Sequence, residues 1–333
     1  MTTRPPLTDS FDRRIESVRI SITDRCNFRC RYCMPAEGLA WLPGDHLLNR
    51  HEVLRLVGVL AGLGVTDVRV TGGEPLLRPD LDDIVRGVAR TPGVREVSIT
   101  TNGVLLADRL DDLVAAGLAR VNVSVDSLDP DRFEASTRRR DLDRVLAGLD
   151  ACARHPGLGD IKVNAVLMRG LGEPDIIPLA QMARTGPFVV RFIEAMPLDA
   201  GGEWTPGDVI AGHEVRALIE SRWPLVPVGR DRPSAPATEW RFADGRGRLQ
   251  FVSSVTEPFC AACDRVRVTA DGQLRTCLFA EHETDLRTPL RSGADDQDIA
   301  DLIVDAVSAK PAGHSIGREG WAYSGRPMSR IGG

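Results

Sequence analysis

Apolar and polar residues alternate along six short segments between residues 16 and 196, and each segment except the last is followed by a helix-like run. The segments predicted as strands are Glu16–Thr23, Asp67–Thr71, Glu96–Thr101, Arg120–Val125, Asp160–Leu167 and Phe188–Ala195. Runs such as His51–Leu63 and Leu142–Ala153 have the spacing of amphipathic helices. This order is typical of βα units around a parallel sheet. The sequence therefore predicts an α/β fold, an incomplete (βα)6 TIM-type barrel.

Each predicted strand has one apolar and one polar face. Successive side chains point to opposite sides of a sheet, and apolar positions such as Val68 and Val70 suit the side under the helices. The polar side collects Arg19, Ser21, Thr23, Arg69, Thr71, Ser98, Thr100, Asn102, Asn122, Ser124, Asp126, Lys162 and Asn164. A closed barrel fills its interior with branched apolar residues. The polar side therefore favours a chamber for a polar ligand over a sheet with one solvated face.

The regular pattern ends beyond residue 196. Asp199–Asp208 and Gly229–Thr238 are rich in Gly, Pro and Asp and are predicted loops, whereas helices are predicted near Gly212–Arg222 and over Asp295–Ser308. We expect an N-terminal arm (1–15), a partial barrel (16–200), a C-terminal extension with a β-hairpin (201–310) and a flexible tail (311–333) that ends in Gly332-Gly333.

Composition adds limits on function. The 333 residues are 42% hydrophobic and 27% charged, which is enough for a sizeable core. A net charge of -5 leaves no general nucleic-acid footprint, so anion binding has to be local. No apolar segment has the character of a signal peptide or the length of a membrane span. We expect a cytoplasmic protein with no membrane and no nucleic-acid partner.

Six of the seven cysteines form two triplets, a pattern that suits metal ligation in a reducing compartment better than disulfides. Cys152 stands alone and fits a small core position. The first triplet, Cys26, Cys30 and Cys33, has C-x3-C-x2-C spacing directly after the first strand. Three thiolates suit a four-iron cluster with one open iron. A zinc site completed by His46 is the competing interpretation.

Two glycines follow the second strand in Gly72-Gly73-Glu74-Pro75, at the end where barrel enzymes place their sites. Glycines let the backbone approach a ligand closely, and free N–H and C=O groups can bind a zwitterion. By itself, the segment also fits a tight turn before the helix near Asp80.

The C-terminal extension carries a second triplet, Cys260, Cys263 and Cys277. Asp271-Gly272 between two alternating runs predicts a type I′ hairpin that returns Cys277 to the other two cysteines. Period two places Arg265 and Arg267 on the face of Cys263, which makes an anion site beside a metal. A zinc site completed by His282 fits the hairpin equally well, and the presence of the first triplet favours a second cluster.

These motifs together resemble a known family. The first triplet resembles the signature of radical S-adenosylmethionine (SAM) enzymes. With the second triplet, Arg265, Arg267 and the terminal Gly332-Gly333, the chain is similar to the GTP 3′,8-cyclases, the A proteins of molybdenum cofactor biosynthesis, over about residues 19–333. The resemblance implies two [4Fe-4S] clusters and S-adenosyl-L-methionine as cofactors, with SAM on the first cluster and the purine of GTP on the second.

The resemblance also implies a reaction and partners. Reductive cleavage of SAM gives a 5′-deoxyadenosyl radical that removes hydrogen from C3′ of GTP, and C3′ then attacks C8. The product is (8S)-3′,8-cyclo-7,8-dihydroguanosine 5′-triphosphate, in the first step of molybdopterin formation. The implied partners are a reduced flavodoxin-like electron donor and the cyclic pyranopterin monophosphate synthase that receives the product. A homodimer is one possible state of assembly, which the sequence does not decide.

The resemblance assigns roles to individual residues. Those implied to contact SAM are Tyr32 through its backbone, Gly73, Ser124 and Met196. Those implied to contact GTP are Arg19, Arg69, Thr100, Lys162, Arg265, Val266 and Arg267. The implied metal ligands are Cys26, Cys30, Cys33, Cys260, Cys263 and Cys277, and the implied catalytic residues are Arg265, Arg267, Gly332 and Gly333, with the diglycine entering the active site.

Two stretches depart from the family. Ser136–Arg140 is a basic run where relatives often carry a glycine, and Ala195-Met196-Pro197 differs from commoner forms of its loop. Two other functions stay open. One is a related radical enzyme acting on a peptide or RNA, which the few auxiliary cysteines and the phosphate-suited arginines disfavour. The other is a zinc-stabilised protein that binds nucleotide without chemistry.

Overall fold

The computed structural model describes residues 5–316 and 326–332. All six predicted strands are present, and each pairs in parallel with the next one along the chain. They are β1 (Ser17–Ser21), β2 (Asp67–Thr71), β3 (Glu96–Thr101), β4 (Arg120–Ser124), β5 (Ile161–Leu167) and β6 (Phe188–Glu194). The predicted α/β partial barrel is therefore confirmed.

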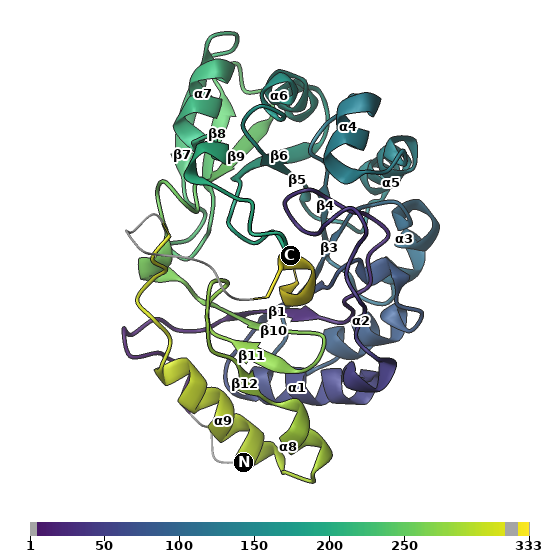
Figure 1. Cartoon of the computed structure of the whole chain (residues 1–333), viewed down its shortest axis with the longest axis vertical. Coiled ribbons are helices and arrows are strands. Elements are labelled where there is room, and N and C mark those ends of the chain that lie inside the picture. Colours follow the sequence, from purple (N-terminus) through teal and green to yellow (C-terminus); the bar gives the residue numbers. More distant parts are fainter. Residues whose placement is uncertain (1–4, 317–325, 333) are drawn as a thin grey trace.

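The connecting helices lie on the outside of the curved sheet (Figure 1). They are α1 (Arg50–Gly62), α2 (Leu81–Ala89), α3 (Leu106–Ala115), α4 (Pro130–Thr137), α5 (Leu142–Arg154) and α6 (Ile176–Thr185). Helix α1 begins at a capping box: the Asn49 side chain accepts from the N–H of Glu52, and the Glu52 carboxylate accepts from the N–H of Asn49.

The apolar strand positions form the core between sheet and helices. Val68, Val70, Ile99, Val121 and Val123 are at most 1% exposed. Because side chains alternate along a strand, the cations, hydroxyls and amides of the same strands point to the inner side of the curve. The inward polar face predicted from the sequence is thus present, and it lines a pocket rather than a flat solvated face.

The region after residue 200 adds strands to both edges of the same sheet. The strand order in the described part of the chain is β12-β11-β10-β1-β2-β3-β4-β5-β6-β9-β8-β7. Strand β9 pairs in parallel with β6, and β10 pairs in parallel with β1. The added elements are α7 (Gly212–Glu220), β7 (Leu225–Gly229), β8 (Thr238–Phe242), β9 (Arg248–Val252), β10 (Arg265–Val268), β11 (Gln273–Arg275), β12 (Thr284–Asp285), α8 (Arg287–Arg291) and α9 (Asp296–Ser308).

The hairpin predicted at Asp271-Gly272 joins β10 to β11, which pair antiparallel. Its turn is not the predicted type I′, because that turn needs positive φ at both central residues. Only Gly272 has it, with φ +78, while Asp271 does not. The N–H of Gly272 donates to the carbonyl of Thr269 at 2.9 Å, and a Cβ on Gly272 would lie 2.8 Å from that of Arg287.

The end of the chain differs from the flexible tail predicted over 311–333. Residues 326–332 form a short helix, α10 (Met328–Ile331), that lies inside the curve of the strands (Figure 1). Ser329 and Ile331 are buried, and Gly332 packs on β1 and β2, where a Cβ would lie 2.4 Å from the Thr71 hydroxyl. The predicted site residue Gly333 lies outside the described residues.

Candidate active site

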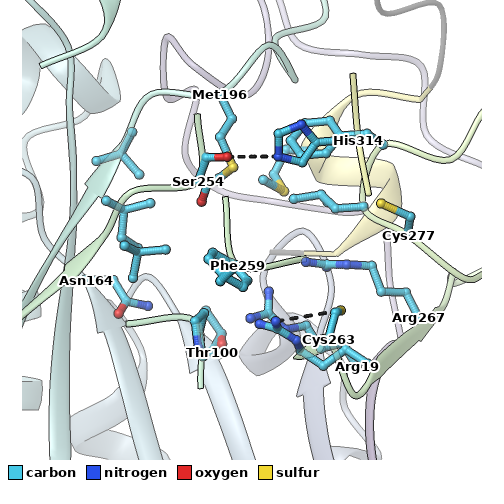
Figure 2. A pocket seen from close by; sticks show the side chains of 18 of the residues that line it. Arg19, Thr100, Asn164, Met196, Ser254, Phe259, Cys263, Arg267, Cys277 and His314 are labelled. Carbon is cyan, nitrogen blue, oxygen red and sulfur yellow. Dashed lines mark hydrogen bonds between the residues drawn. The ribbon is translucent and has the colours of Figure 1, made fainter. Parts of the chain in front are cut away.

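A chamber opens on the inner side of the sheet, and its walls come from both halves of the chain (Figure 2). The predicted site residues among its lining are Arg19, Tyr32, Arg69, Thr100, Ser124, Met196, Cys260, Cys263, Arg265, Arg267 and Cys277. The structure therefore brings together the predicted substrate residues of β1–β3, the predicted SAM contact Ser124 of β4, the second triplet and the two hairpin arginines.

The cations of the chamber are buried close to one another. Burial, and after it the neighbouring guanidiniums, lower the pKa of Arg69 to about 10 and those of Arg191 and Arg267 to about 9. The pKa of Arg19 is lowered by burial and then by Arg267 and Arg69. Arginine keeps its proton at neutral pH, so these shifts express positive charge without sufficient counter-charge. Such a group is suited to a polyanion such as a triphosphate.

Two predicted GTP contacts lie elsewhere. Lys162 does not line the pocket, although its pKa is lowered to about 7, first by burial and then by Arg191, Arg120 and Arg69, which places it against the same cations. The Val266 side chain is 1% exposed and lies opposite Val18 of β1, in the apolar core. Any contact from Val266 to a ligand therefore has to be made by its backbone.

Among the other lining residues, Arg191, Phe259 and His314 had no predicted role, whereas Asn164 was predicted on the polar face of its strand. The Arg191 guanidinium donates two hydrogen bonds to the Gln250 side-chain oxygen, at 3.1 and 2.7 Å, so β9 orients it. Its signal was an arginine inside an otherwise apolar strand, Val189-Val190-Arg191-Phe192-Ile193. Phe259 and His314 had no comparable signal, since both come from irregular segments.

The first cysteine loop is packed directly against the Gly-Gly-Glu-Pro segment. The N–H of Gly73 donates to the carbonyl of Thr23 at 2.8 Å, and that of Glu74 donates to Arg25 at 2.7 Å. A Cβ on Gly73 would lie 2.4 Å from the Arg25 carbonyl oxygen, so only glycine fits here. Gly73 is therefore required by the approach of two loops, and it does not line the described chamber.

The basic run Ser136–Arg140 holds the other side of that loop. The N–H groups of Arg29 and Arg31 donate to Thr137 and Ser136 at 3.0 Å each. Arg138 has φ +56, and its guanidinium donates to the carbonyls of Arg29 and Met34 at 2.7 and 3.0 Å. This explains an arginine at a left-handed position that glycine adopts more easily: its side chain ties the cysteine loop to α4.

The thiols of the first triplet are half-buried, and acidic groups lie near two of them. Burial and then Glu74 raise the pKa of Cys26 to about 12, and burial raises that of Cys33 to about 11. The pKa of Cys30 is raised by burial and then by Asp126. Cys33 also raises the pKa values of Cys26 and Cys30, and Cys26 raises that of Cys30, because the thiols lie near one another. A cationic metal group is what would favour their ionised form.

The second triplet lies among cations. Burial raises the pKa of Cys263, but Arg265 and Lys310 lower it by more, so the net shift is downward. The Arg265 guanidinium reaches the Cys263 sulfur at 3.7 Å. Figure 2 shows Cys263, Cys277 and Arg267 around one end of the chamber. The predicted return of Cys277 to the other cysteines, with Arg265 and Arg267 on the Cys263 face, is confirmed.

The donor sets can be compared with the metals they were predicted to hold. Within the described residues, no three His, Cys, Asp or Glu side chains are placed to share a single metal ion. Two sets of three clustered, unpaired thiols fit a larger body such as a four-iron cluster, which takes one thiolate per iron and leaves one iron open.

The described end of the chain contacts both halves of the site. Arg267 donates to the carbonyl of Gly332, Met328 lines the chamber, and Ser329 lies next to the Cys33 thiol, whose pKa it lowers. The predicted entry of the terminal glycines into the site thus agrees with the position of Gly332.

The two halves of the chain match two known protein families. Residues 20–183 match the Radical SAM superfamily, and residues 188–316 match Molybdenum Cofactor Synthesis C. A GTP 3′,8-cyclase from Mycobacterium sp. (strain KMS) is 48% identical over 100% of this chain and 95% of its own length. The chain belongs to the GTP 3′,8-cyclase family. A second family member, from Corynebacterium glutamicum (strain ATCC 13032), is 46% identical over 98% of this chain and 89% of its own length.

Solved structures agree on the fold. SuiB of Streptococcus suis bound to S-adenosylmethionine superposes with a TM-score of 0.56 at 13% identity, over 87% of this chain and 68% of that one. Membership of the radical SAM superfamily implies a [4Fe-4S] cluster and S-adenosylmethionine. No helix in the described ranges has the length and apolar character to cross a bilayer.

Proposed function

We propose that this protein converts GTP to (8S)-3′,8-cyclo-7,8-dihydroguanosine 5′-triphosphate, the first step of molybdopterin biosynthesis. One observation carries the proposal: the second cysteine triplet and a group of buried cations with insufficient counter-charge line the same chamber. A triphosphate provides the missing negative charge, and an open iron at the triplet provides a ligand position for the purine.

Residues of this chain bind and orient the nucleotide. Arg19 and Arg69 hold the triphosphate, together with Arg191, which β9 fixes in place, and Lys162 adds positive charge from outside the pocket lining. Arg265 and Arg267 extend from the second triplet along β10 and hold the nucleotide between its base and its phosphates. Enclosure by the barrel excludes water from a reactive carbon centre, and orientation by several strands brings C3′ toward C8.

The cysteine loop at Cys26, Cys30 and Cys33 holds the first cluster, and the second triplet holds another. When bound, the first cluster and SAM supply a 5′-deoxyadenosyl radical for hydrogen removal from C3′. Ser124, Met196 and Tyr32 line the chamber wall that SAM would occupy. Gly73 contributes backbone at the same end of the barrel.

Partners and location follow the same proposal. A reduced flavodoxin-like protein supplies the electron, and a cyclic pyranopterin monophosphate synthase takes the product in the cytoplasm. A homodimer is the proposed assembly.

The test is anaerobic incubation of the reconstituted protein with GTP, SAM and dithionite. We expect 5′-deoxyadenosine, methionine and the cyclised triphosphate in equal amounts, with about eight irons per chain. SAM cleavage without a GTP-derived product would contradict the proposed substrate and return a peptide or RNA to consideration.

A further inference from the structure

A buried ammonium group lies behind the second triplet. It belongs to Lys310, which has no part in the proposed function. Lys310 follows α9, is 3% exposed and does not line the chamber. Its Nζ donates to the carbonyl of Arg265 at 2.9 Å and to that of Thr276. Those two residues lie on β10 and directly before Cys277, so Lys310 joins both chain segments of the triplet from behind.

Lys310 has carbonyl partners but no carboxylate partner among residues 5–316 and 326–332. Burying an ammonium group without an opposite charge is costly. Both of its carbonyl partners adjoin the triplet, because Arg265 lies two residues after Cys263 and Thr276 directly precedes Cys277. Its natural counter-charge is therefore an anion at the triplet. A four-iron cluster held by three thiolates is such an anion, and its negative charge grows by one on reduction.

A second cation fixes the segment that carries Lys310. Arg13 is buried and paired with Asp9 at 2.6 Å. Its guanidinium donates to the carbonyls of Cys260, Ala312 and Pro311 at 2.8, 2.8 and 2.6 Å. The N-terminal segment thus binds residues 311–312 to Cys260, which keeps the adjoining Lys310 in position.

We propose that Lys310 is the buried counter-charge of the second cysteine triplet and raises the reduction potential of the cluster held there. Arg13 is its positioning residue. The inference rests on the proposed function only for the presence of that second cluster. Physically, a fixed positive charge beside the thiolates stabilises the reduced, more negative cluster more than the oxidised one.

The test compares Lys310→Gln, which keeps a hydrogen-bond donor without charge, with Lys310→Arg, which keeps the charge. Both are made in a background with Cys26, Cys30 and Cys33 replaced by Ala, so that the spectroscopic signal comes from the second cluster. Anaerobic redox titration is followed by electron paramagnetic resonance, with iron content measured on the same samples. Arg109→Gln is the matched control, because Arg109 also donates to two backbone carbonyls but belongs to α3.

At the midpoint potential of the parent protein, we expect the reduced-to-oxidised ratio of Lys310→Gln to fall about tenfold, which is ~59 mV for a one-electron couple. Lys310→Arg and Arg109→Gln keep the parent potential. An unchanged potential in Lys310→Gln, or an equal shift in Lys310→Arg, overturns the proposal. If only Lys310→Gln loses iron at the second triplet, the cluster requires the positive charge, which supports the proposal. If both variants lose it, Lys310 has only a packing role, which overturns the proposal.

The outcome is separable from that of the proposed function. Wild-type protein with about eight irons that does not cyclise GTP contradicts the function and leaves the potentials to decide this inference. Wild-type protein with about four irons, all lost when the first triplet is replaced, contradicts the second cluster and this inference together.

Discussion

The first cysteine triplet is carried by one loop, whereas the second is assembled from two segments on either side of a hairpin. Acidic groups lie near the first: Glu74 raises the pKa of Cys26 and Asp126 raises that of Cys30, in addition to burial. Cations lie near the second, where Arg265 and Lys310 give Cys263 a lowered pKa. The two sets of thiols therefore differ in the charged groups that lie nearest to them.

This difference shows how one chain can use two sets of three cysteine thiols for different purposes. A cluster near acidic groups is harder to reduce, and once reduced it is a stronger electron donor. A cluster near cations accepts an anionic ligand beside it. The first setting suits cleavage of SAM, and the second suits a nucleotide with its phosphates.

Removing each triplet in turn should have the largest effect and tests whether the two triplets have different functions. Replacing Cys26, Cys30 and Cys33 with Ala should abolish reductive cleavage of SAM. Replacing Cys260, Cys263 and Cys277 should abolish GTP conversion but keep slow, uncoupled cleavage. The readouts are 5′-deoxyadenosine, GTP-derived product and iron, which should fall from about eight to about four in either variant. Retained SAM cleavage in the first variant would refute the assignment of that loop.

The cationic side of the comparison is tested at the hairpin. Replacing Arg265 or Arg267 with Ala should weaken GTP binding by about 1.5–3 kcal/mol, the contribution of a charge-assisted hydrogen bond. Equilibrium dialysis with the reconstituted protein measures the change. Arg169, a half-exposed arginine paired with Glu214, is the control and should have no effect when replaced with Ala. Wild-type affinity in both hairpin variants would remove them from the site.

The chain end links the two triplets, because Ser329 contacts Cys33 and Gly332 contacts Arg267. Deleting Gly332-Gly333 should lower kcat roughly tenfold, as expected for about 1.4 kcal/mol of lost transition-state stabilisation. Both clusters should keep their iron and visible spectra. A normal rate would show that the contact of Gly332 with Arg267 has no part in turnover.

The smallest expected effect sharpens the electrostatic contrast at Lys162. Its pKa is about 7 in the free protein, below its ordinary value of 10.5. The unfolded chain therefore binds more protons between these values, and stability should rise with pH across that window. Binding of the triphosphate favours the charged form of Lys162. The protein should therefore take up to about one proton per GTP bound at pH ~8. Calorimetry in buffers of different ionisation enthalpy measures this uptake, and Lys162→Met should abolish it.

The chamber was predictable because strand periodicity is local. Arg19, Arg69, Thr100 and Ser124 follow from alternation within single strands, and all four line the pocket. Arg191 was not predicted as a residue of the chamber, because β6 is apolar on both sides of it and has no clear alternation. Val266 stays a predicted contact through its backbone, because its side chain is buried on the face opposite to Arg265 and Arg267.

Other features depend on partners far away in the chain. Strands β8 and β9 have five residues each, and they form a regular sheet only because β6 offers an edge. The chain end has the Gly, Ser and Arg composition of a mobile tail, yet Ile331 is buried inside the barrel. Lys310 had no sequence signal as a partner of the cysteines, since only the fold places it behind them.

The pairing of β10 with β1 and of β9 with β6 also has a consequence for biosynthesis. Residue 17 lies opposite residue 265, and residue 189 lies opposite residue 248. While the ribosome is making the first 247 residues, the emerging half-barrel has an unpaired strand at each side. Such edges invite pairing with other chains, and contacts this distant along a polypeptide form slowly. Newly made protein therefore passes through a stage in which aggregation competes with completion, and chaperones that shield strand edges act at that stage.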